Sequence, residues 1–422
     1  MIGGAGLIIL LLGVFLVVFK RPASDTSKVD LKVWVVAGKE ALTQMGQAYT
    51  ENIHKNVSLR FETVDAANYE DRWFSALAAG EGPDIVMIHN RALPKLQKTL
   101  SPAYVTQLTI DGFRNLFPQV AEEEFTSQDQ VYALPLYMDT LLMYYNRDLL
   151  DQAGITQLPK TWNDLQNAIT KLVSLNPRGQ IIRAAAAIGG SKKTIVTAVD
   201  ILNLLMLQTG VKMTDSDHAQ AIFGGSGAGG LGQQAFNFYL KFSNPNYPYY
   251  TWNDDQPDYV QSFAGGKTAI IFDYYARKSD IKKKNAFLNF AVAPMPQPAG
   301  ATVDVNYADY WGLAVSKQSR NPNWAWDFVL YAATTPDNAI AYATAANQLP
   351  ALRSLIANNF TNQELAVPAK QALTARSWYQ ADENQIQRIF SQAIQNVLSG
   401  KTESREALSQ ANDQISQLMT SK

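Results

Sequence analysis

Apolar and polar positions alternate along the first part of the chain. Apolar residues occupy every second position over 29–35 and again, up to Phe61, over 57–63, and in the segment 84–88 an apolar run of four residues follows Asp84. This period of two predicts three β-strands, and the segments between them, 40–52 and 69–79, have the apolar spacing of helices. Strand, helix, strand, helix, strand implies an α/β fold with a parallel sheet, in which ligands bind at the carboxyl ends of the strands.

Helix signals return in the second half of the chain. Thr161 with Asp164 matches a capping box, because each side chain can accept from a backbone amide at the start of a helix. Apolar residues then recur at helical spacing over 386–397, and Gly400 follows as a C-terminal cap. Another helix is predicted over 403–418.

The N-terminus carries a different pattern. Residues 2–19 are apolar apart from glycines, which is about the length that spans a bilayer. We therefore expect residues 1–22 to form a transmembrane helix that anchors the protein, or alternatively a signal segment, and 23–28 to be a linker. Lys20 and Arg21 follow the span, and positive charge there favours a cytoplasmic body, although long domains translocate largely regardless of flanking charge.

Composition narrows the function. A chain of 422 residues with 47% hydrophobic residues is too long for one ordinary domain, so two lobes are expected. The net charge of −1, with dispersed basic residues, argues against nucleic acid as a partner. Cysteine is absent, which excludes disulfides, thiolate metal sites and a cysteine lipid acceptor.

Enzyme signatures are weak. Gly225, Gly227 and Gly230 have G-x-G-x-x-G spacing, but no strand clearly precedes them, so a loop that leads into a helix over 233–241 is the preferred interpretation. The three histidines are scattered without paired metal-ligand spacing. We expect no metal, no cofactor and no catalytic activity.

A series of short motifs resembles bacterial extracellular solute-binding proteins of the maltose-binding type. In chain order they are ALAAGEGPDIV at 76–86, VYALP at 131–135, Asp139-Thr140, YYNRDLL at 144–150, PKTW at 159–162, FAGGKTA at 263–269, VAPMP at 292–296, WGLAVS at 311–316, AWDF at 325–328 and LPA at 349–351. Each motif is weak alone, but their order over residues 29–418 is specific. The resemblance implies a two-lobed periplasmic-binding-protein-like fold (type II) with three crossing hinge segments.

The crossings are expected near Met138, Thr268 and Leu313. That placement assigns 29–138 and 269–313 to the first lobe, and 139–268 and 314–422 to the second.

A cleft between two lobes is where a small ligand binds, and a hydroxyl-rich ligand needs aromatic faces together with hydrogen-bonding groups. The resemblance places candidate polar contacts in turns after the first and third strands and at the crossings: Lys39, Glu40, His89, Asn90, Arg91, Asp139, Asp309 and Arg353. The candidate aromatic contacts are Tyr137, Trp252, Tyr274, Tyr275, Tyr307, Tyr310, Trp311 and Trp378. Asp139 could instead make a hinge hydrogen bond, His89 could be a turn residue without ligand contact, and Trp252 could belong to a surface lid.

The resemblance implies the substrate-binding component of an ABC importer, a monomer on the outer face of the membrane that closes on a mono- or oligosaccharide and delivers it to permease subunits. Two alternatives stay open. The same fold could serve a sensor that reports to a membrane receptor, or the solute could be a peptide or polyamine, bound by carboxylates such as Asp139 and Asp309.

Overall fold

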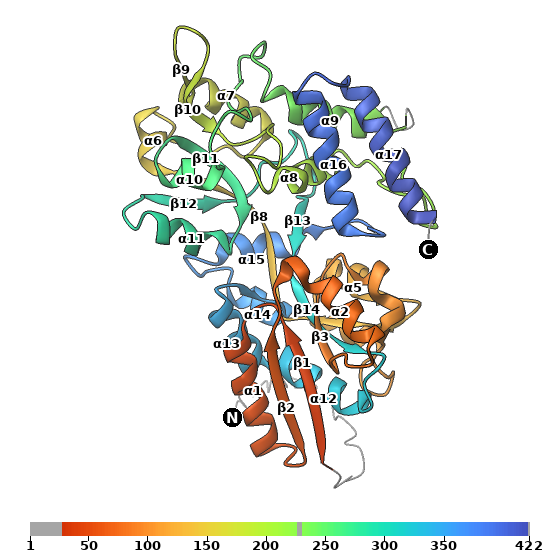
Figure 1. Ribbon diagram of the computed structural model, residues 1–422. Coiled ribbons are helices and arrows are strands. Elements are labelled where there is room, and N and C mark those ends of the chain that lie inside the picture. The colour runs from red at the N-terminus through yellow and green to blue at the C-terminus, as the bar shows by residue number, and fades with distance from the viewer. Residues whose placement is uncertain (1–27, 226–229, 421–422) are drawn as a thin grey trace, which may run out of the picture.

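The protein folds around two separate hydrophobic cores. The computed structural model describes residues 28–225 and 230–420, and the apolar run at 2–19 lies outside them. Within these described ranges no helix is both long enough and apolar enough to cross a membrane. One core gathers residues from 29–138 and 308–375, and the other gathers residues from 141–307 and 381–419. We call these two bodies the first and second lobes; they are the lower and upper halves of Figure 1.

The first lobe is built on a sheet with strand order β2-β1-β3-β14-β4, with β7 paired to β14. Its strands are β1 (Val29–Val35), β2 (Val57–Thr63), β3 (Ile85–His89), β4 (Leu100–Ser101), β7 (Ala133–Pro135) and β14 (Trp311–Ser316), with β5 (Thr126–Ser127) and β6 (Gln130–Val131) forming a separate hairpin. Its helices are α1 (Lys39–Asn52), α2 (Tyr69–Ala78), α3 (Leu93–Leu96), α4 (Ile110–Leu116), α5 (Gln119–Phe125), α12 (Pro322–Thr334), α13 (Pro336–Ala346), α14 (Arg353–Asn358) and α15 (Ala366–Ala372).

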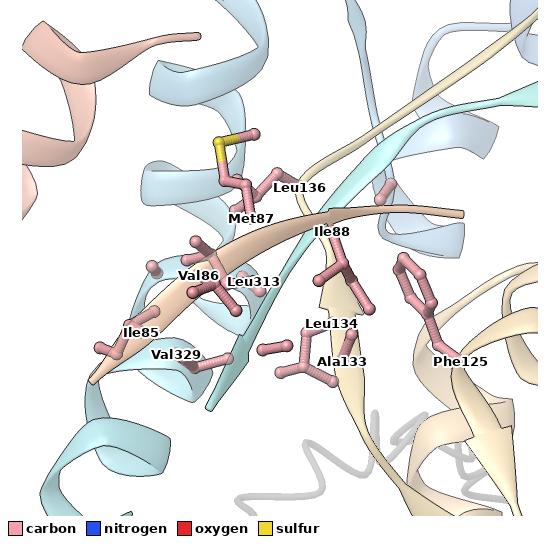
Figure 2. Close-up of a cluster of buried hydrophobic side chains, with 14 of the residues drawn as sticks. Ile85, Val86, Met87, Ile88, Phe125, Ala133, Leu134, Leu136, Leu313 and Val329 are labelled. Atoms are coloured by element: carbon pink, nitrogen blue, oxygen red, sulfur yellow. The ribbon is translucent and has the colours of Figure 1, made fainter. Parts of the chain in front are cut away.

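β1 lies inside this sheet, and its alternating apolar residues are buried in the first-lobe core, namely Val29, Leu31, Val33 and Val35. β1 pairs in parallel with β2, in register from Val29 with Val57, and with β3 on its other side. β14 then runs antiparallel to β3, with Leu313 opposite Met87. Figure 2 shows side chains of β3, β7 and β14 packed together with Val329 of α12 and Phe125 of α5. The carboxyl ends of β1 and β3 consequently point toward the second lobe.

The second lobe contains a sheet with order β16-β13-β8-β11-β10-β9, to which β12 and β15 add by pairing with β8. Two strands of this sheet, β15 (Leu349–Pro350) and β16 (Ala375–Arg376), have Leu349 and Ala375 buried in the first-lobe core and so lie where the lobes meet. The strands of the second lobe are β8 (Tyr137–Asn146), β9 (Ser174–Leu175), β10 (Ile181–Ala186), β11 (Thr268–Tyr274), β12 (Phe290–Ala293) and β13 (Asn306–Asp309). Its helices are α6 (Arg147–Gln152), α7 (Trp162–Leu172), α8 (Ala198–Gln208), α9 (Leu231–Lys241), α10 (Tyr259–Ala264), α11 (Arg277–Lys284), α16 (Glu383–Leu398) and α17 (Ser404–Thr420).

Three segments join the lobes. The first is the start of β8, the second runs from β13 into β14, and the third leads from β16 to α16; β8 and β13 lie between the two halves of Figure 1. The first two crossings are adjacent strands, with Asp139 opposite Asp309, and β16 pairs with β13 through Arg376 and Tyr307. The crossings are thus held side by side as a small hinge sheet.

The lobe assignment expected from the sequence needs correction in its second half. β11, in 269–313, lies between β8 and β10 in the second-lobe sheet, and α12 and α13, in 314–422, pack on the first lobe. A crossing near Met138 agrees with the structure, but Thr268 begins a buried strand of the second lobe. The apolar pattern of β11 suits either sheet, and its pairing with β8 decides where it lies.

The predictions of individual strands and helices agree with the structure. Strands are found over 29–35, 57–63 and 85–89, and helices α1, α2, α9, α16 and α17 match the segments predicted as helical. The Thr161 hydroxyl accepts from the Asp164 amide at 3.1 Å, and the Asp164 carboxylate accepts from the Thr161 amide at 2.9 Å, so the capping box is confirmed.

Candidate functional site

A cluster of four charged side chains lies where the lobes meet. His89 and Arg91 come from the end of β3 in the first lobe, Asp309 from the second crossing, and Glu383 from the first turn of α16 in the second lobe. His89 Nδ1 lies 2.6 Å from Glu383 Oε2, and His89 Nε2 lies 2.9 Å from Asp309 Oδ1. Arg91 donates to Glu383 Oε1 at 2.9 Å and to Asp309 Oδ1 at 3.2 Å. His89 and Arg91 therefore bind the second lobe to the first.

The electrostatics of the cluster favour its charged form. Burial opposes charge on His89, but the carboxylates of Glu383 and Asp309 outweigh it and raise the pKa of His89 to about 10. Burial likewise opposes charge on Glu383, but Arg91 and His89 lower the pKa of Glu383 to about 2. Two cations thus face two anions, and the cluster carries no net charge near neutral pH.

A cavity of about 440 Å³ adjoins this cluster. The first lobe contributes Asn90, Arg91 and residues of α3 and α5, and the third crossing contributes 377–380. Its aromatic wall is Trp378 with Tyr379, whose ring stacks on His218 with centroids 4.2 Å apart. The cavity is therefore an interlobe cavity lined by both aromatic and hydrogen-bonding side chains.

The polar groups of the interlobe cavity differ in how they are satisfied. Asn90 donates to both oxygens of Glu124 at 2.8 and 2.9 Å, and the Tyr310 hydroxyl donates to the same carboxylate at 2.5 Å. Gln380 is 1% exposed and donates to the Tyr307 hydroxyl at 3.2 Å, but its Oε1 accepts from no group among the described residues. A buried polar atom without a partner is costly, so this acceptor is well placed for a ligand donor.

Several predicted aromatic residues surround the charged cluster. The Arg91 guanidinium lies over the Tyr307 ring at 4.9 Å from its centroid, and His89 packs edge-on against Trp311 at 5.3 Å. Tyr274 is at the end of β11, and its buried hydroxyl has no hydrogen-bond partner in the described part of the chain. Burial, together with the carboxylates of Asp200 and Asp309, raises the pKa of Tyr274, so the hydroxyl stays protonated.

Asp139 serves the hinge. Its carboxylate accepts from the backbone amides of Thr140 and Tyr275 at 2.8 Å each and from Ala276 at 3.1 Å. Burial raises the pKa of Asp139 to about 7 in spite of these amides. The carboxylate therefore joins the first crossing to the end of β11, as the hinge interpretation of this residue predicts. Tyr137, two residues earlier, stacks against Tyr342 of α13 with centroids 6.4 Å apart.

Three predicted contacts lie elsewhere. Trp252 is fully buried in the second-lobe core, where its indole nitrogen donates to Thr194 at 3.0 Å. Arg353 donates to the carbonyl of Phe117 at 2.6 Å, at the end of α4. The Tyr310 ring is buried in the first lobe against Phe125. Nothing in the local sequence distinguishes these core and surface positions from cleft positions.

The turn after β1 and the second tyrosine after β11 also stay outside the cluster. Lys39 and Glu40 begin α1, where Glu40 is exposed and Lys39 half-buried. Tyr275 is buried under Lys278, whose ammonium lies 5.4 Å from the ring centroid. Within the described ranges, no group of three or more His, Asp or Glu side chains is arranged to hold a metal ion.

Sequence reasoning missed Glu383, Glu124 and Gln380. Glu383 follows the N-cap Asp382 of α16, and an acidic residue in a first turn is expected for helix stability alone.

A second ion-pair group that joins the lobes beside the cluster was also missed. Lys95 of the first lobe contacts Glu70 at 2.6 Å and Asp382 of the second lobe at 2.9 Å. These side chains meet only through the tertiary fold, so no spacing in the sequence reveals them.

The fold and site have counterparts among known proteins. The family model described as bacterial extracellular solute-binding protein matches residues 36–339, so the chain belongs to that family. Among curated relatives, the maltodextrin-binding protein MdxE of Bacillus subtilis is 25% identical over 345 residues, which cover 79% of this chain and 75% of that protein.

Solved structures share the fold at lower identity. The cyclic α-maltosyl-1,6-maltose binding protein of Arthrobacter globiformis superposes with a TM-score of 0.77 at 16% identity, covering 94% of this chain and all of that one. The sugar-binding protein MalE of Xanthomonas citri gives 0.75 at 19% identity, covering 93% and 97%. The two-lobed α/β fold implied by the sequence motifs is thereby established.

Proposed function

We propose that this chain is the extracellular substrate-binding component of an ABC importer and that it captures a carbohydrate between its lobes. The observation that carries the proposal is the interlobe cavity, which is lined by the aromatic wall of Trp378 and Tyr379 together with amide and carboxylate groups. Sugars present C–H faces that pack on aromatic rings and hydroxyls that need such partners. The similarity to maltodextrin-binding MdxE and to sugar-binding structures points to the same ligand class.

Capture follows from the hinge. The crossings are two paired strands and β16, so the lobes can rotate about them while each core stays intact. A solute that contacts both lobes shifts the population toward the closed form by its differential affinity for that form. The contacts of His89 and Arg91 with Glu383 form only when the lobes are close together, so they stabilise the closed form.

We extend the proposal to location and assembly. Residues 2–19 would anchor the protein in the membrane with both lobes outside, where a monomer would deliver solute to permease subunits. The chain would bind its solute without converting it, as its family description as a solute-binding protein suggests.

We favour a neutral solute over a peptide or polyamine, because the two carboxylates expected to bind an amine are already engaged. An amine would need free carboxylates, but Asp139 accepts from three backbone amides and Asp309 is paired with His89 and Arg91. If the Asp139 carboxylate turned away from these amides to bind an amine, the buried amide donors would be left unpaired. Each unpaired donor costs about 1–3 kcal/mol.

Thermal-shift measurement with a panel of mono- and oligosaccharides tests the proposal. The full chain should be held in a detergent without a sugar headgroup, so that the micelle does not compete. A solute at a hundred times its dissociation constant stabilises the folded state by about 2.7 kcal/mol, which raises the melting temperature by several degrees. Peptides and polyamines serve as comparison ligands. A shift with these and none with any sugar would overturn the carbohydrate assignment.

A pair of glutamine variants tests the cavity. Gln380→Met keeps the side-chain volume but removes the buried acceptor, and we expect sugar affinity to fall roughly tenfold or more. Gln348→Met is the matched control, because Gln348 Oε1 is also buried without a partner among the described residues but does not line the cavity. Equal affinities in both variants would place the solute elsewhere.

A further inference from the structure

The loop after α11 presents an aromatic side chain to solvent. Phe287 is 97% exposed, more than any other large hydrophobic residue that the structure describes. It lies three residues after Lys284, and the exposed Lys282, Lys283 and Lys284 form the last turn of α11. We call residues 282–287 the Lys-Phe tip. It lies at the edge of the second lobe, next to α11 in Figure 1.

The backbone of the tip is fixed rather than loose. The Asn285 side chain accepts from the Phe287 amide at 3.0 Å and donates to the Ala264 carbonyl at 2.9 Å, which ties the turn to the end of α10. The Asn285 amide in turn donates to Ile281, which is buried in the second-lobe core. These hydrogen bonds fix the backbone next to Phe287. Binding through this turn would therefore cost little additional backbone entropy.

The lysines of the tip form no ion pair in the described part of the chain, and their electrostatic partner is Glu364, whose pKa is lowered chiefly by Lys278 and to a smaller extent by Lys282. The neighbouring Asp280 is instead paired with Arg277 at 2.8 Å. Lysines at the end of a helix are favoured by its dipole, which accounts for their position. It does not account for a fully exposed phenylalanine beside them.

We propose that the Lys-Phe tip contacts the anionic surface of the lipid bilayer, with Phe287 entering the interface and the lysines binding headgroups. Lysine is depleted at protein–protein interfaces, but it is attracted to anionic lipid by roughly fivefold in affinity per residue. The tip also presents a single large apolar side chain, Phe287, which is almost fully exposed. These features fit a lipid surface better than a permease subunit.

The membrane anchor proposed above for residues 2–19 would make such a contact reachable, and this step rests on that proposal. β1 starts at Val29, about nine residues after the apolar run at 2–19, and nine extended residues span at most about 30 Å. The first lobe would thus stay near the bilayer, while the tip belongs to the second lobe. The contact would hold the second lobe at the membrane independently of the tether.

The cysteine-free chain allows a direct test. Ala286→Cys, labelled with an environment-sensitive fluorophore, places a probe beside Phe287 in the full chain reconstituted in vesicles. We expect blue-shifted emission with vesicles of phosphatidylcholine that contain about one third phosphatidylglycerol, and little shift with phosphatidylcholine alone. Raising the salt concentration should weaken the shift, because it screens the lysines.

Two variants of the labelled chain identify the groups responsible. K282Q/K283Q/K284Q should bind the surface roughly a hundredfold more weakly and lose most of the blue shift; Phe287→Ser should lose it too. The control K98Q/K212Q/K401Q replaces three exposed lysines on other elements and should keep it. Flotation with neutral vesicles reports separately whether residues 2–19 anchor the chain.

A probe that stays in water on anionic vesicles, or a shift that survives in the lysine variant, would overturn the proposal. A shift seen only with bacterial membranes, and absent with pure lipid, would indicate a protein partner and would also overturn it.

Discussion

The pairing of His89 with two carboxylates sets a pH dependence at the scale of single residues. The pKa of His89 is about 10 in the folded protein and near 6.5 in an unfolded chain. A raised histidine pKa stabilises the folded state fully below pH 6.5, and this contribution is lost as the pH rises toward 10. For Glu383 the pKa is lowered to about 2, so its contribution is present above about pH 4.5 and lost as the pH falls toward 2.

His89→Gln should therefore flatten the alkaline side of the stability profile. Between pH 6 and pH 9 we expect the free energy of unfolding to fall more in the parent chain than in the variant, by a difference on the order of 2–4 kcal/mol. Urea unfolding at several pH values measures it. Parallel profiles would show that folding does not raise the pKa of His89.

Glu383→Gln should weaken solute binding more than it weakens the fold. The substitution keeps the shape of the side chain but removes the charge that Arg91 and His89 contact across the lobes. In the closed form of the variant, the buried cations Arg91 and His89 would lack this carboxylate partner, so closure on the solute would be less favourable. We expect a tenfold or greater loss of affinity by isothermal titration. Glu406→Gln, in the first turn of α17, is the control and should bind like the parent.

Which single residues belong to the site was the hardest feature to predict from the sequence. His89, Arg91 and Asp309 were chosen as candidates through the resemblance to a family, and the structure brings them into one cluster. Trp252 was chosen for its aromatic character but lies in a core. An exposed and a buried tryptophan look alike in a sequence, because burial depends on which distant elements pack around the residue.

At the scale of elements, the capping box of α7 is a local feature and was predictable from the sequence. Thr161→Ala removes the hydroxyl that accepts from the Asp164 amide, and we expect a loss of about 1 kcal/mol in the free energy of unfolding. Urea unfolding measures this loss. Thr170→Ala, on the exposed face of the same helix, should cost less. Equal losses would mean that the cap contributes nothing of its own.

The same reasoning explains which elements were assigned to the wrong lobe. Strands and helices follow from spacing within about ten residues, whereas the lobe of β11 depends on its pairing with β8, from Ile270 with Tyr145 to Tyr274 with Leu141. Both candidate partners in the sequence were apolar strands. Spacing alone could not choose between them, so the crossing expected at Thr268 was wrong. A crossing does lie near Leu313, between Tyr307 and Ala308, but it leads from the second lobe to the first, the reverse of the expected order.

At the scale of the whole molecule, the two cores predict two units of hydrogen exchange. Leu134→Ala removes a fully buried side chain of the first-lobe core and should cost about 2–5 kcal/mol. Exchange should then accelerate over 29–135 and 311–372 together, and much less in β10 and β11. Mass spectrometry of peptic fragments resolves these segments. Joint acceleration of 314–422 with 139–268 would contradict the present lobe assignment.

Strand β14 has a consequence for how the protein comes to be folded after synthesis. It lies in the sheet between β3 and β4, with Leu313 opposite Met87, although most of the second lobe separates these strands in the chain. A growing chain therefore exposes the apolar edge of β3 until residues near 316 emerge from the ribosome. The sheet of the first lobe thus cannot be completed before residues near 316 are made, whereas most of the second-lobe core, at 141–307, is synthesised earlier.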